Sequence, residues 1–515
     1  MKRILSTLAI LVPLAGQAVP ANIAVEGFGF EMAEMQEGAV AFLNRTYVWK
    51  NVPAELRGWQ FTKTSGGIHP TLKVTAKTAG EVYFAVALAR GSGSPGLLGW
   101  QAVRGLRFRY TAGDEPTLRV FRRQVESGEI LDIEQLGWTG SIVLAPSLTA
   151  TVIEPVPDHS KVPGVVINHR PAYTHDYIGC PAIEILRPGV YVASHTSFGN
   201  GPSRGKLRLF QSDDAGRTWR QLALLPHIHF ASLFLRSGDL YLMGVYKEGV
   251  AVLRSGDEGV TWTEPIDENT GLVLPSTRAH SAAVPVVHHN GRLWRAMEDS
   301  QAGGGWPRHF RAFMMSAPED ADLLRADAWT CSNRLRSVPT WLGRESKGWL
   351  EGNAVVTPNG AIVNILRVDS WEGGKAAVIT HSPDGREATF DPVTGFVDFP
   401  GGGKKFTIRH DPVSKRYWSL TNAIDESTRA GREAGGVRNN LVLISSADLT
   451  HWTTKRTVIS NPDAFKHGFQ YVDWQFEGND IVAVSRTSCD DGIGGARNHH
   501  DANYFTFHRV SDFRE

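Results

Sequence analysis

Histidine and acidic side chains recur at similar places along the last two-thirds of the chain, and residues of these types can do acid–base chemistry. An imidazole changes its charge near neutral pH, so a histidine can donate or accept a proton in a reaction. The residues concerned are His175, Asp176, His195, His227, His229, His280, Glu298, Asp299 and His467. His227 and His229 are one residue apart, but no third ligand accompanies them at a fixed spacing. We therefore expect no essential metal and no cofactor.

A repeated motif indicates the elements that must position these side chains. Residues 212–219 read S-x-D-x-G-x-T-W, residues 255–262 read the same, and weaker echoes begin at Ser316, Ser382 and Ser446. In such a motif the aspartate accepts hydrogen bonds from the backbone of a hairpin turn, the glycine takes a positive φ, and the tryptophan packs between sheets. A pair of strands precedes each full copy, so the repeat predicts the sheets of a β-propeller.

The length of the repeating region predicts the number of blades. About 350 residues follow position 165. At roughly 50 to 60 residues per blade they form six blades, with seven the less favoured number. The start of each innermost strand of a propeller points at the central funnel. Histidines and acids near such starts are therefore expected to meet in one polar site.

The repeated turns resemble the Asp-boxes of the sialidase (neuraminidase) superfamily, and the resemblance covers roughly residues 165–515. Residues 349–360, together with the following residues up to Arg367, resemble a family segment. In that segment a Glu lies at the start of one strand and an Arg at the end of the next one. In that family the Glu activates a nucleophilic Tyr, and the Arg binds a carboxylate of the substrate. The resemblance therefore implies these roles for Glu351 and Arg367.

Two further positions complete the set that the resemblance implies. Arg438 resembles another carboxylate-binding arginine, and Tyr471 resembles the nucleophile of the terminal segment. The chemistry agrees with these roles. A phenol with a pKa near 10 needs a neighbouring carboxylate to lose its proton at neutral pH. A guanidinium group suits a bidentate grip on a carboxylate.

The sequence departs from the family pattern at the first arginine and at the acid. Residues 177–183 lie where sialidases carry an R-I-P segment, but no arginine is present there. The acidic Asp expected downstream is also absent, and the loop at residues 193–199 offers His195 instead, so we expect His195 or a nearby acid to be the proton donor. Arg486 could line the last blade, and residues 497–501 either do so too or form a solvated closing loop, which is the favoured alternative. Further substrate contacts are expected from His175, Tyr177, His229, His280 and Glu298.

The remainder of the chain predicts a second domain and export. Residues 22–155 carry short apolar runs separated by Gly, Ser and Pro turns. They indicate an N-terminal β-sandwich that either binds sugar through exposed aromatic rings or caps the propeller. Residues 1–21 are typical of a signal peptide, so we expect a secreted or periplasmic protein without a membrane span. The formal net charge of +1 provides no field that would attract nucleic acid.

These features predict an all-β protein, a sialidase-like six-bladed β-propeller preceded by a β-sandwich, with a glycan or polysaccharide as its partner. The favoured function is an exo-glycosidase of the sialidase-like type that acts on an acidic or modified sugar. One alternative is a polysaccharide lyase, in which a His and a Tyr move protons beside a uronate carboxylate. A second alternative is a glycan-binding propeller without catalysis.

Overall fold

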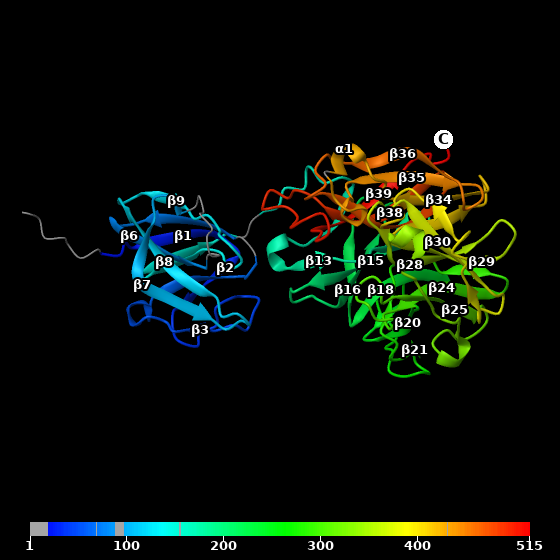
Figure 1. The fold of residues 1–515 in the computed structure, drawn as a ribbon, viewed down its shortest axis with the longest axis horizontal. Coiled ribbons are helices and arrows are strands. Elements are labelled where there is room, and N and C mark those ends of the chain that lie inside the picture. The colour runs from blue at the N-terminus through cyan, green and yellow to red at the C-terminus, as the bar shows by residue number, and fades with distance from the viewer. Residues whose placement is uncertain (1–18, 68–69, 88–96, 154–155, 430) are drawn as a thin grey trace, which may run out of the picture. The chain divides into compact units, whose positions relative to one another are not determined.

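The computed structural model describes residues 19–67, 70–87, 97–153, 156–429 and 431–515. The expected signal peptide lies mostly outside the described residues. The chain divides into two compact units, Met1–Val156 and Pro157–Glu515. Strands make up nearly all of the regular structure in both units, as the sequence predicted (Figure 1). Among the described residues, no helix is long and apolar enough to cross a membrane.

The first unit contains two sheets that share a hydrophobic core. The strands of the smaller sheet follow the order β11 (Leu148–Val152), β1 (Ile23–Phe28), β5 (Thr71–Ala76) and β9 (Ile130–Asp132). The larger sheet has the order β2 (Phe30–Glu34), β4 (Gln60–Thr64), β10 (Ile142–Ala145), β6 (Gly80–Val86), β8 (Thr117–Val125), β7 (Gln101–Tyr110) and β3 (Trp49–Lys50). Val25 and Val74 of the smaller sheet pack in one buried cluster with Val82 and Val143 of the larger one.

The second unit contains six sheets in chain order, and the first three run as follows. The first consists of β13 (Asp176–Ile178) and β14 (Ala182–Arg187), which both pair with β15 (Val190–Gly199), then β16 (Lys206–Ser212) and β17 (Arg220–Pro226). The second consists of β18 (Ile228–Arg236), β19 (Asp239–Tyr246), β20 (Gly249–Ser255) and β21 (Leu272–Leu274). The third consists of β22 (Ala279–His280), β23 (Val287–His289), β24 (Arg292–Asp299), β25 (Arg311–Pro318), β26 (Thr330–Cys331) and β27 (Leu335–Arg336).

The other three sheets complete the unit, and the last one joins its two ends. The fourth consists of β28 (Ser346–Val356), β29 (Ile362–Ser370), β30 (Lys375–His381), β31 (Ala388–Thr389) and β32 (Phe396–Asp398). The fifth consists of β33 (Thr407–Asp411), β34 (Arg416–Thr421), β35 (Asn440–Ser446) and β36 (Trp452–Ser460). The sixth has the order β37 (Gly468–Glu477), β38 (Asp480–Ser488), β39 (Tyr504–Val510) and β12 (Val165–His169), so the start of the unit pairs with its end.

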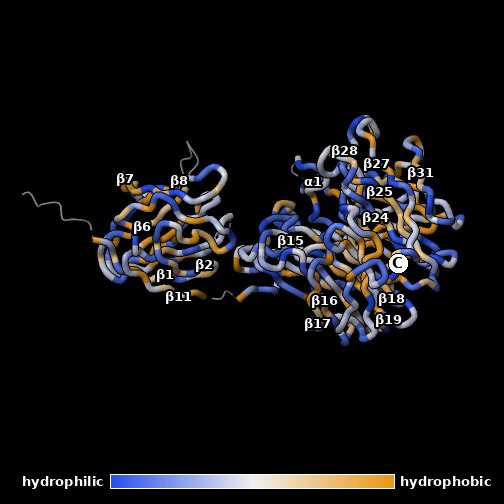
Figure 2. The backbone as a smooth tube through the Cα atoms, turned by 90° about the horizontal axis from the view of Figure 1, so that it is seen from below, coloured by the Kyte–Doolittle hydropathy of each residue, from blue (hydrophilic) through white to orange (hydrophobic). Residues whose placement is uncertain are grey.

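Hydrophobic clusters join each sheet of the second unit to the next, which closes the sheets into a ring. One cluster holds side chains of the first and second sheets, and corresponding clusters join the second to the third, the third to the fourth, the fourth to the fifth and the fifth to the sixth. The ring is closed by Ile183 and Ala193 of the first sheet, which pack with Val482 and Phe505 of the sixth. Hydrophobic stretches follow the strands inside each unit (Figure 2).

The repeated motifs form turns of one kind, each after the third strand of its sheet. In the first copy, Asp214 accepts hydrogen bonds from Ser212 Oγ at 2.9 Å and from Thr218 Oγ1 at 2.6 Å, and Trp219 Nε1 donates to the Gly216 carbonyl at 3.1 Å. The second copy repeats these bonds with distances of 2.8, 2.6 and 2.9 Å. The echo at Ser446 keeps the serine-to-aspartate bond at 3.1 Å. The turns thus tie the third strand to the fourth, away from the innermost strands.

Candidate active site

Innermost strands of the second, fourth and sixth sheets meet at a cavity of about 360 Å³ in the second unit. Glu351 and Leu350 enter it from β28, Tyr471 from β37, and His229 and Phe230 from β18. The full lining comprises Gly179, Cys180, Thr196, Phe198, His229, Phe230, His280, Trp306, Leu350, Glu351, Arg367, Arg438, Tyr471, Arg486 and His500. Residues that are 120 positions apart in the chain therefore share one cavity.

Each of the strands β18, β28 and β37 has a backbone bulge that turns one of its side chains toward the cavity. The strand pairing shifts register between His229 and Ser232, between Leu350 and Asn353, and between Gln470 and Asp473. Inside these bulges Phe230, Glu351 and Tyr471 have φ values of 49°, 56° and 56°. Positive φ is costly for side chains of this size, and such strain is concentrated at functional sites. A β-bulge also redirects a side chain out of the regular alternation of a strand.

Tyr471 and Glu351 are in direct hydrogen-bond contact in the cavity. The Tyr471 hydroxyl donates to Glu351 Oε1 at 2.7 Å, and Arg367 Nη1 donates to Glu351 Oε2 at 2.9 Å. Arg367 also binds Asp369 Oδ2 at 3.1 Å through Nη2. The guanidinium group of Arg367 therefore holds one oxygen of Glu351 and leaves the other facing the phenol. Arg367 was expected to bind a substrate carboxylate, but the carboxylates that it binds here belong to the protein.

Burial and charge determine the protonation of this pair. Burial raises the pKa of Glu351, but Arg367 and His280 outweigh it, so the pKa of this carboxyl lies below its usual value. Burial raises the pKa of the Tyr471 phenol, and Glu351 raises it further, against the opposing effect of three nearby guanidinium groups. At neutral pH the resting state is thus a protonated phenol that donates to an ionised carboxylate.

Two more guanidinium groups lie over the Tyr471 ring. The Arg486 guanidinium carbon is 4.9 Å from the ring centroid and that of Arg438 is 5.7 Å from it. Arg438 donates to the Gly435 carbonyl at 2.8 Å and to Gln470, while Arg486 donates to the His500 carbonyl at 3.2 Å. Burial lowers the pKa of Arg438 to about 10 and also lowers the pKa of Arg486. The cavity therefore holds three arginines, with positive charge concentrated around the phenol.

The third arginine was not among the predicted substrate contacts. Arg486 was expected only as a residue that could line the last blade, and its side chain is buried and lines the cavity from β38. In the register of the sixth sheet, Arg486 pairs with Gln470, the residue before Tyr471. Pairing the strand that contains Tyr471 with the strand after it would have located Arg486 from the sequence. The cavity therefore has a third arginine although the R-I-P position lacks one.

A histidine and a glutamate form a second titratable pair beside the first. His280 lines the cavity, and its Nδ1 lies 2.7 Å from Glu298 Oε1. The same oxygen of Glu298 accepts the backbone N–H of Glu351 at 3.0 Å. Glu298 is fully buried, and burial raises its pKa above the usual value. Because Nδ1 is engaged, Nε2 is the nitrogen that His280 can present to a ligand.

Four of the residues predicted to act on the substrate or to contact it do not line the cavity: His195, His175, Tyr177 and Glu298. His195 is fully buried in β15, a second strand of its sheet rather than a loop, and its ring packs against Phe210 and Phe505. Its Nε2 lies 2.9 Å from Asn168 Nδ2, and its Nδ1 lies 2.9 Å from the Thr196 carbonyl. The prediction of His195 as the acid is therefore wrong, because its ring does not line the cavity and both ring nitrogens are engaged by Asn168 and Thr196.

His175 and Tyr177 are also placed outside the lining. His175 follows the 3-10 turn Ala172–Thr174 in a left-handed conformation, and it is buried. The Tyr177 hydroxyl lies 3.4 Å from His175 Nδ1 and 3.4 Å from Arg497 Nη1. The prediction that these two residues contact substrate is therefore wrong for this cavity. Of the other predicted contacts, His229 and His280 line the cavity, and Glu298 acts through His280.

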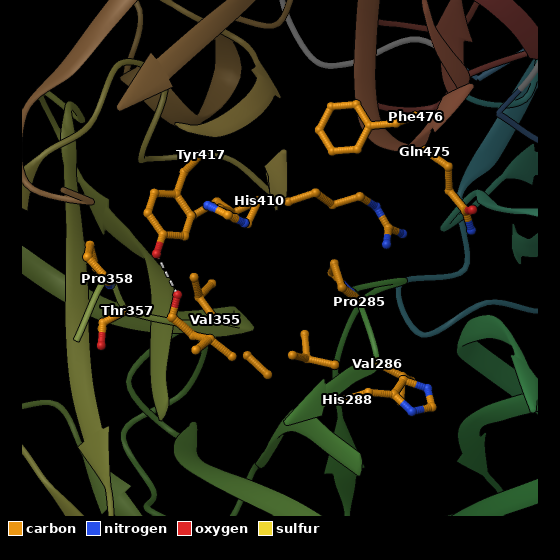
Figure 3. A pocket seen from close by; sticks show the side chains of 15 residues that line it. Pro285, Val286, His288, Val355, Thr357, Pro358, His410, Tyr417, Gln475 and Phe476 are labelled. Atoms are coloured by element: carbon orange, nitrogen blue, oxygen red, sulfur yellow. Dashed lines mark hydrogen bonds between the residues drawn. The ribbon is translucent and has the colours of Figure 1, made fainter. Parts of the chain in front are cut away.

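A larger cavity of about 570 Å³ lies further along the same strands (Figure 3). Val355 on β28 and Gln475 and Phe476 on β37 line it, four or five residues beyond Glu351 and Tyr471. At about 3.3 Å per residue, this separation is on the order of 15 Å. Tyr417 in this cavity donates its hydroxyl to the Val356 carbonyl at 2.7 Å, as the dashed line in Figure 3 shows. No carboxylate lines it among the described residues, so it is not the catalytic candidate.

Among the residues that the structure describes, no three His, Cys, Asp or Glu side chains are arranged to hold a metal ion. His227 and His229 thus do not form part of such a group. The chemistry of the cavity has to be argued from its phenol, carboxylates, imidazoles and guanidinium groups.

Comparison with known proteins finds similar structures but no family. No protein-family model and no curated protein matches the chain. The α-L-arabinanase of Penicillium chrysogenum, complexed with arabinobiose, is 15% identical over 70% of this chain and 99% of that one, with a TM-score of 0.42. The sialidase of Trypanosoma rangeli, with the inhibitor DANA, is 13% identical over 69% and 60%, with a TM-score of 0.43. The leech intramolecular trans-sialidase is 10% identical over 96% and 92%, with a TM-score of 0.44. Sialidases are thus among the solved structures to which this chain is similar.

Proposed function

We propose that this protein is a glycoside hydrolase that cleaves the glycosidic bond of an acidic sugar through a covalent intermediate on Tyr471. The observation that carries the proposal is the 2.7 Å hydrogen bond from the Tyr471 hydroxyl to Glu351, inside a cavity lined by three arginines. The six sheets would form a six-bladed propeller and the two sheets of the first unit a β-sandwich. We also propose that the protein is exported, on the signal-peptide pattern of residues 1–21.

The chemistry of the first step follows from the partners of Tyr471. The phenol oxygen attacks the anomeric carbon while its proton passes to Glu351 Oε1, which is already its hydrogen-bond acceptor. Arg367 keeps Glu351 ionised and oriented, because it binds the other oxygen at 2.9 Å. A neutral phenol can approach an anomeric centre beside a carboxylate without the repulsion that a carboxylate nucleophile would meet. This explains why a Tyr–Glu pair suits an acidic sugar.

The second requirement is an acid for the leaving group, and His280 is the best placed residue. Its Nδ1 is fixed by Glu298, so Nε2 can protonate the departing oxygen and later accept a proton from water. That water then attacks the anomeric carbon and breaks its bond to the Tyr471 oxygen. Glu351 returns the proton to the phenolate. Each proton thus has a donor and an acceptor among residues that line the cavity or touch its lining.

The charge of the cavity indicates the class of sugar. Arg438 uses Nε and Nη1 for Gly435 and Gln470, and among the described residues no acceptor is bonded to its Nη2. Arg486 likewise uses Nε and Nη2 for the His500 carbonyl, which leaves Nη1. Two guanidinium nitrogens are therefore available for a carboxylate of the substrate. A ulosonate or a uronate supplies such a group.

Turnover of fluorogenic aryl glycosides tests the proposal. The panel contains α-ketosides of ulosonates, glucuronides and neutral arabinofuranosides, and the Tyr471→Phe variant is compared with a matched Tyr177→Phe control. We expect release from an acidic member and a loss of about 10³-fold or more in Tyr471→Phe. Tyr177→Phe should keep its rate within about threefold, since that hydroxyl does not line the cavity.

Three results would contradict the proposal. Full turnover by Tyr471→Phe would refute the assignment of Tyr471 as the nucleophile. Cleavage of only the neutral members of the panel would refute the assignment of an acidic sugar as the substrate. New ultraviolet absorbance from carbon–carbon double bonds, when the protein acts on a uronate polysaccharide, would identify the protein as a lyase instead.

A further inference from the structure

Three aromatic side chains of the first unit form a continuous wall, here called the aromatic shelf: Tyr47, Tyr110 and Trp138. The Tyr47 and Tyr110 rings are stacked with centroids 5.7 Å apart, and the Tyr110 and Trp138 rings are stacked at 6.0 Å. All three line a cavity of about 550 Å³. Trp138 is 42% exposed although it is a large apolar residue, whereas Tyr110 is buried.

The fold holds Trp138 in place rather than leaving it as a loose surface side chain. Gly66 and Gly67 lie directly against the indole, because a Cβ on Gly66 would come within 2.4 Å of it and one on Gly67 within 3.0 Å. The Gly67 N–H donates to the Trp138 carbonyl at 2.7 Å, and Phe42 packs its edge on the ring at 5.4 Å. The backbone near these glycines is thus shaped to seat an indole. A rigid aromatic surface binds a ligand at a low cost in conformational entropy.

Polar groups stand at the edge of the shelf. Asp114, Thr117 and Thr139 line the same cavity, and the Asp114 side chain is exposed at the tip of the β7–β8 hairpin. Burial and, after it, the nearby Asp114 carboxylate raise the pKa of Tyr110 to about 12. A ring-shaped ligand on the shelf would therefore meet apolar surface on its face and hydrogen-bond acceptors at its rim.

We propose that the aromatic shelf binds a sugar ring of a polysaccharide, as a site separate from the catalytic cavity. The C–H face of a pyranose is apolar and matches a flat aromatic surface, while its hydroxyl groups point outward to partners such as Asp114. Asp114 lines the cavity and the Arg45 guanidinium carbon lies 5.8 Å from the Trp138 ring centroid, so one negative and one positive charge border the shelf and offset each other, which suits a neutral sugar. The shelf and the arginine-lined cavity would thus recognise different sugars.

This proposal does not depend on the proposed hydrolysis, and the experiment keeps the two apart. All proteins carry the Tyr471→Phe change, so that no bound polysaccharide is consumed. Binding of the full chain is measured by co-sedimentation with cellulose, chitin and mannan, and by affinity electrophoresis in soluble glucomannan and polygalacturonate. Trp138→Ala and Tyr47→Ala are compared with Trp138→Phe, and with Ile130→Ala, a 59% exposed side chain of the same unit outside the shelf.

We expect at least one neutral polysaccharide to bind, and Trp138→Ala to weaken that binding about tenfold or more, as loss of a tryptophan contact does at other interfaces. Trp138→Phe should retain part of the affinity, and Ile130→Ala all of it. Circular dichroism verifies that each variant is folded, and Tyr47→Ala provides the second test if Trp138→Ala does not fold. The proposal is overturned if no neutral polysaccharide binds, or if the folded alanine variants bind as well as their parent.

Discussion

Replacing Arg486 with methionine tests whether the arginine that motif comparison missed recognises the substrate. Methionine keeps most of the length and apolar volume of the side chain and removes the charge. The guanidinium group of Arg486 is buried, 4.9 Å from the centroid of the Tyr471 ring, so it is placed to pair with a carboxylate on a sugar bound at Tyr471. The variant should lose activity on acidic sugars and keep it on neutral ones.

The expected size follows from the geometry of a charge pair. Two unit charges about 4 Å apart interact by about 4 kcal/mol at an effective dielectric constant near 20. Part of this is offset because the substrate carboxylate has to leave water and because Arg438 remains beside it. Truncating one partner of a buried charge pair costs about 2–5 kcal/mol, and we take a value near 2.7 kcal/mol. The ratio kcat/KM on an acidic glycoside should therefore fall about 100-fold.

The assay compares an acidic glycoside with its carboxyl-reduced counterpart, which has the same leaving group. Arg486→Met should lose about 100-fold on the first and less than about threefold on the second. Arg386→Met is the matched control, because that side chain is 72% exposed and lies outside the cavity. Equal losses on both substrates, at an unchanged melting temperature, would refute the assignment of Arg486 to the carboxylate.

Two further predictions concern the histidines. His280→Gln should lower kcat by about 10²–10⁴ for a sugar leaving group and far less for a nitrophenolate, because a nitrophenolate needs no proton to leave. Steady-state kinetics with both leaving groups test this. Equal losses on both would exclude His280 as the acid. Burial lowers the pKa of His195 to about 3, below the value near 6.5 of the unfolded chain, so its contribution to stability is complete above pH 6.5 and is lost as the pH falls toward 3. Between pH 7 and 5 this loss is about 2 kcal/mol; urea unfolding at the two pH values should show a smaller loss in His195→Gln, and an unchanged loss would contradict the burial of a neutral ring.

Motif comparison located Glu351 and Tyr471 because each is marked by local sequence. Turns after the third strand fix where sheets begin and end, and a short segment around Glu351 carries its own pattern. The structure then brings the two side chains within 2.7 Å of each other. Arg486 carried no such mark, since its place in the cavity follows from strand register in the sixth sheet rather than from a motif.

The error at His195 has a different physical origin. His195 was expected in a loop that takes the place of the family's acidic Asp, but the residue lies on the second strand of its sheet. There the alternation of side chains turns the ring between neighbouring sheets, where Phe210 and Phe505 enclose it. The sequence predicts this strand. It does not predict the position of the strand in the sheet, because two short strands, β13 and β14, precede it and both pair with it.

The matching bulges in β18, β28 and β37 have a consequence for how such a ring changes its chemistry. Each presents one side chain to the centre from the same kind of backbone irregularity, yet the three residues are a phenylalanine, a glutamate and a tyrosine. The irregularity belongs to the main chain and not to any one side chain. The side chain at each bulge can therefore be substituted without changing the backbone. Such a substitution can alter the reaction while the surrounding sheets stay as they are.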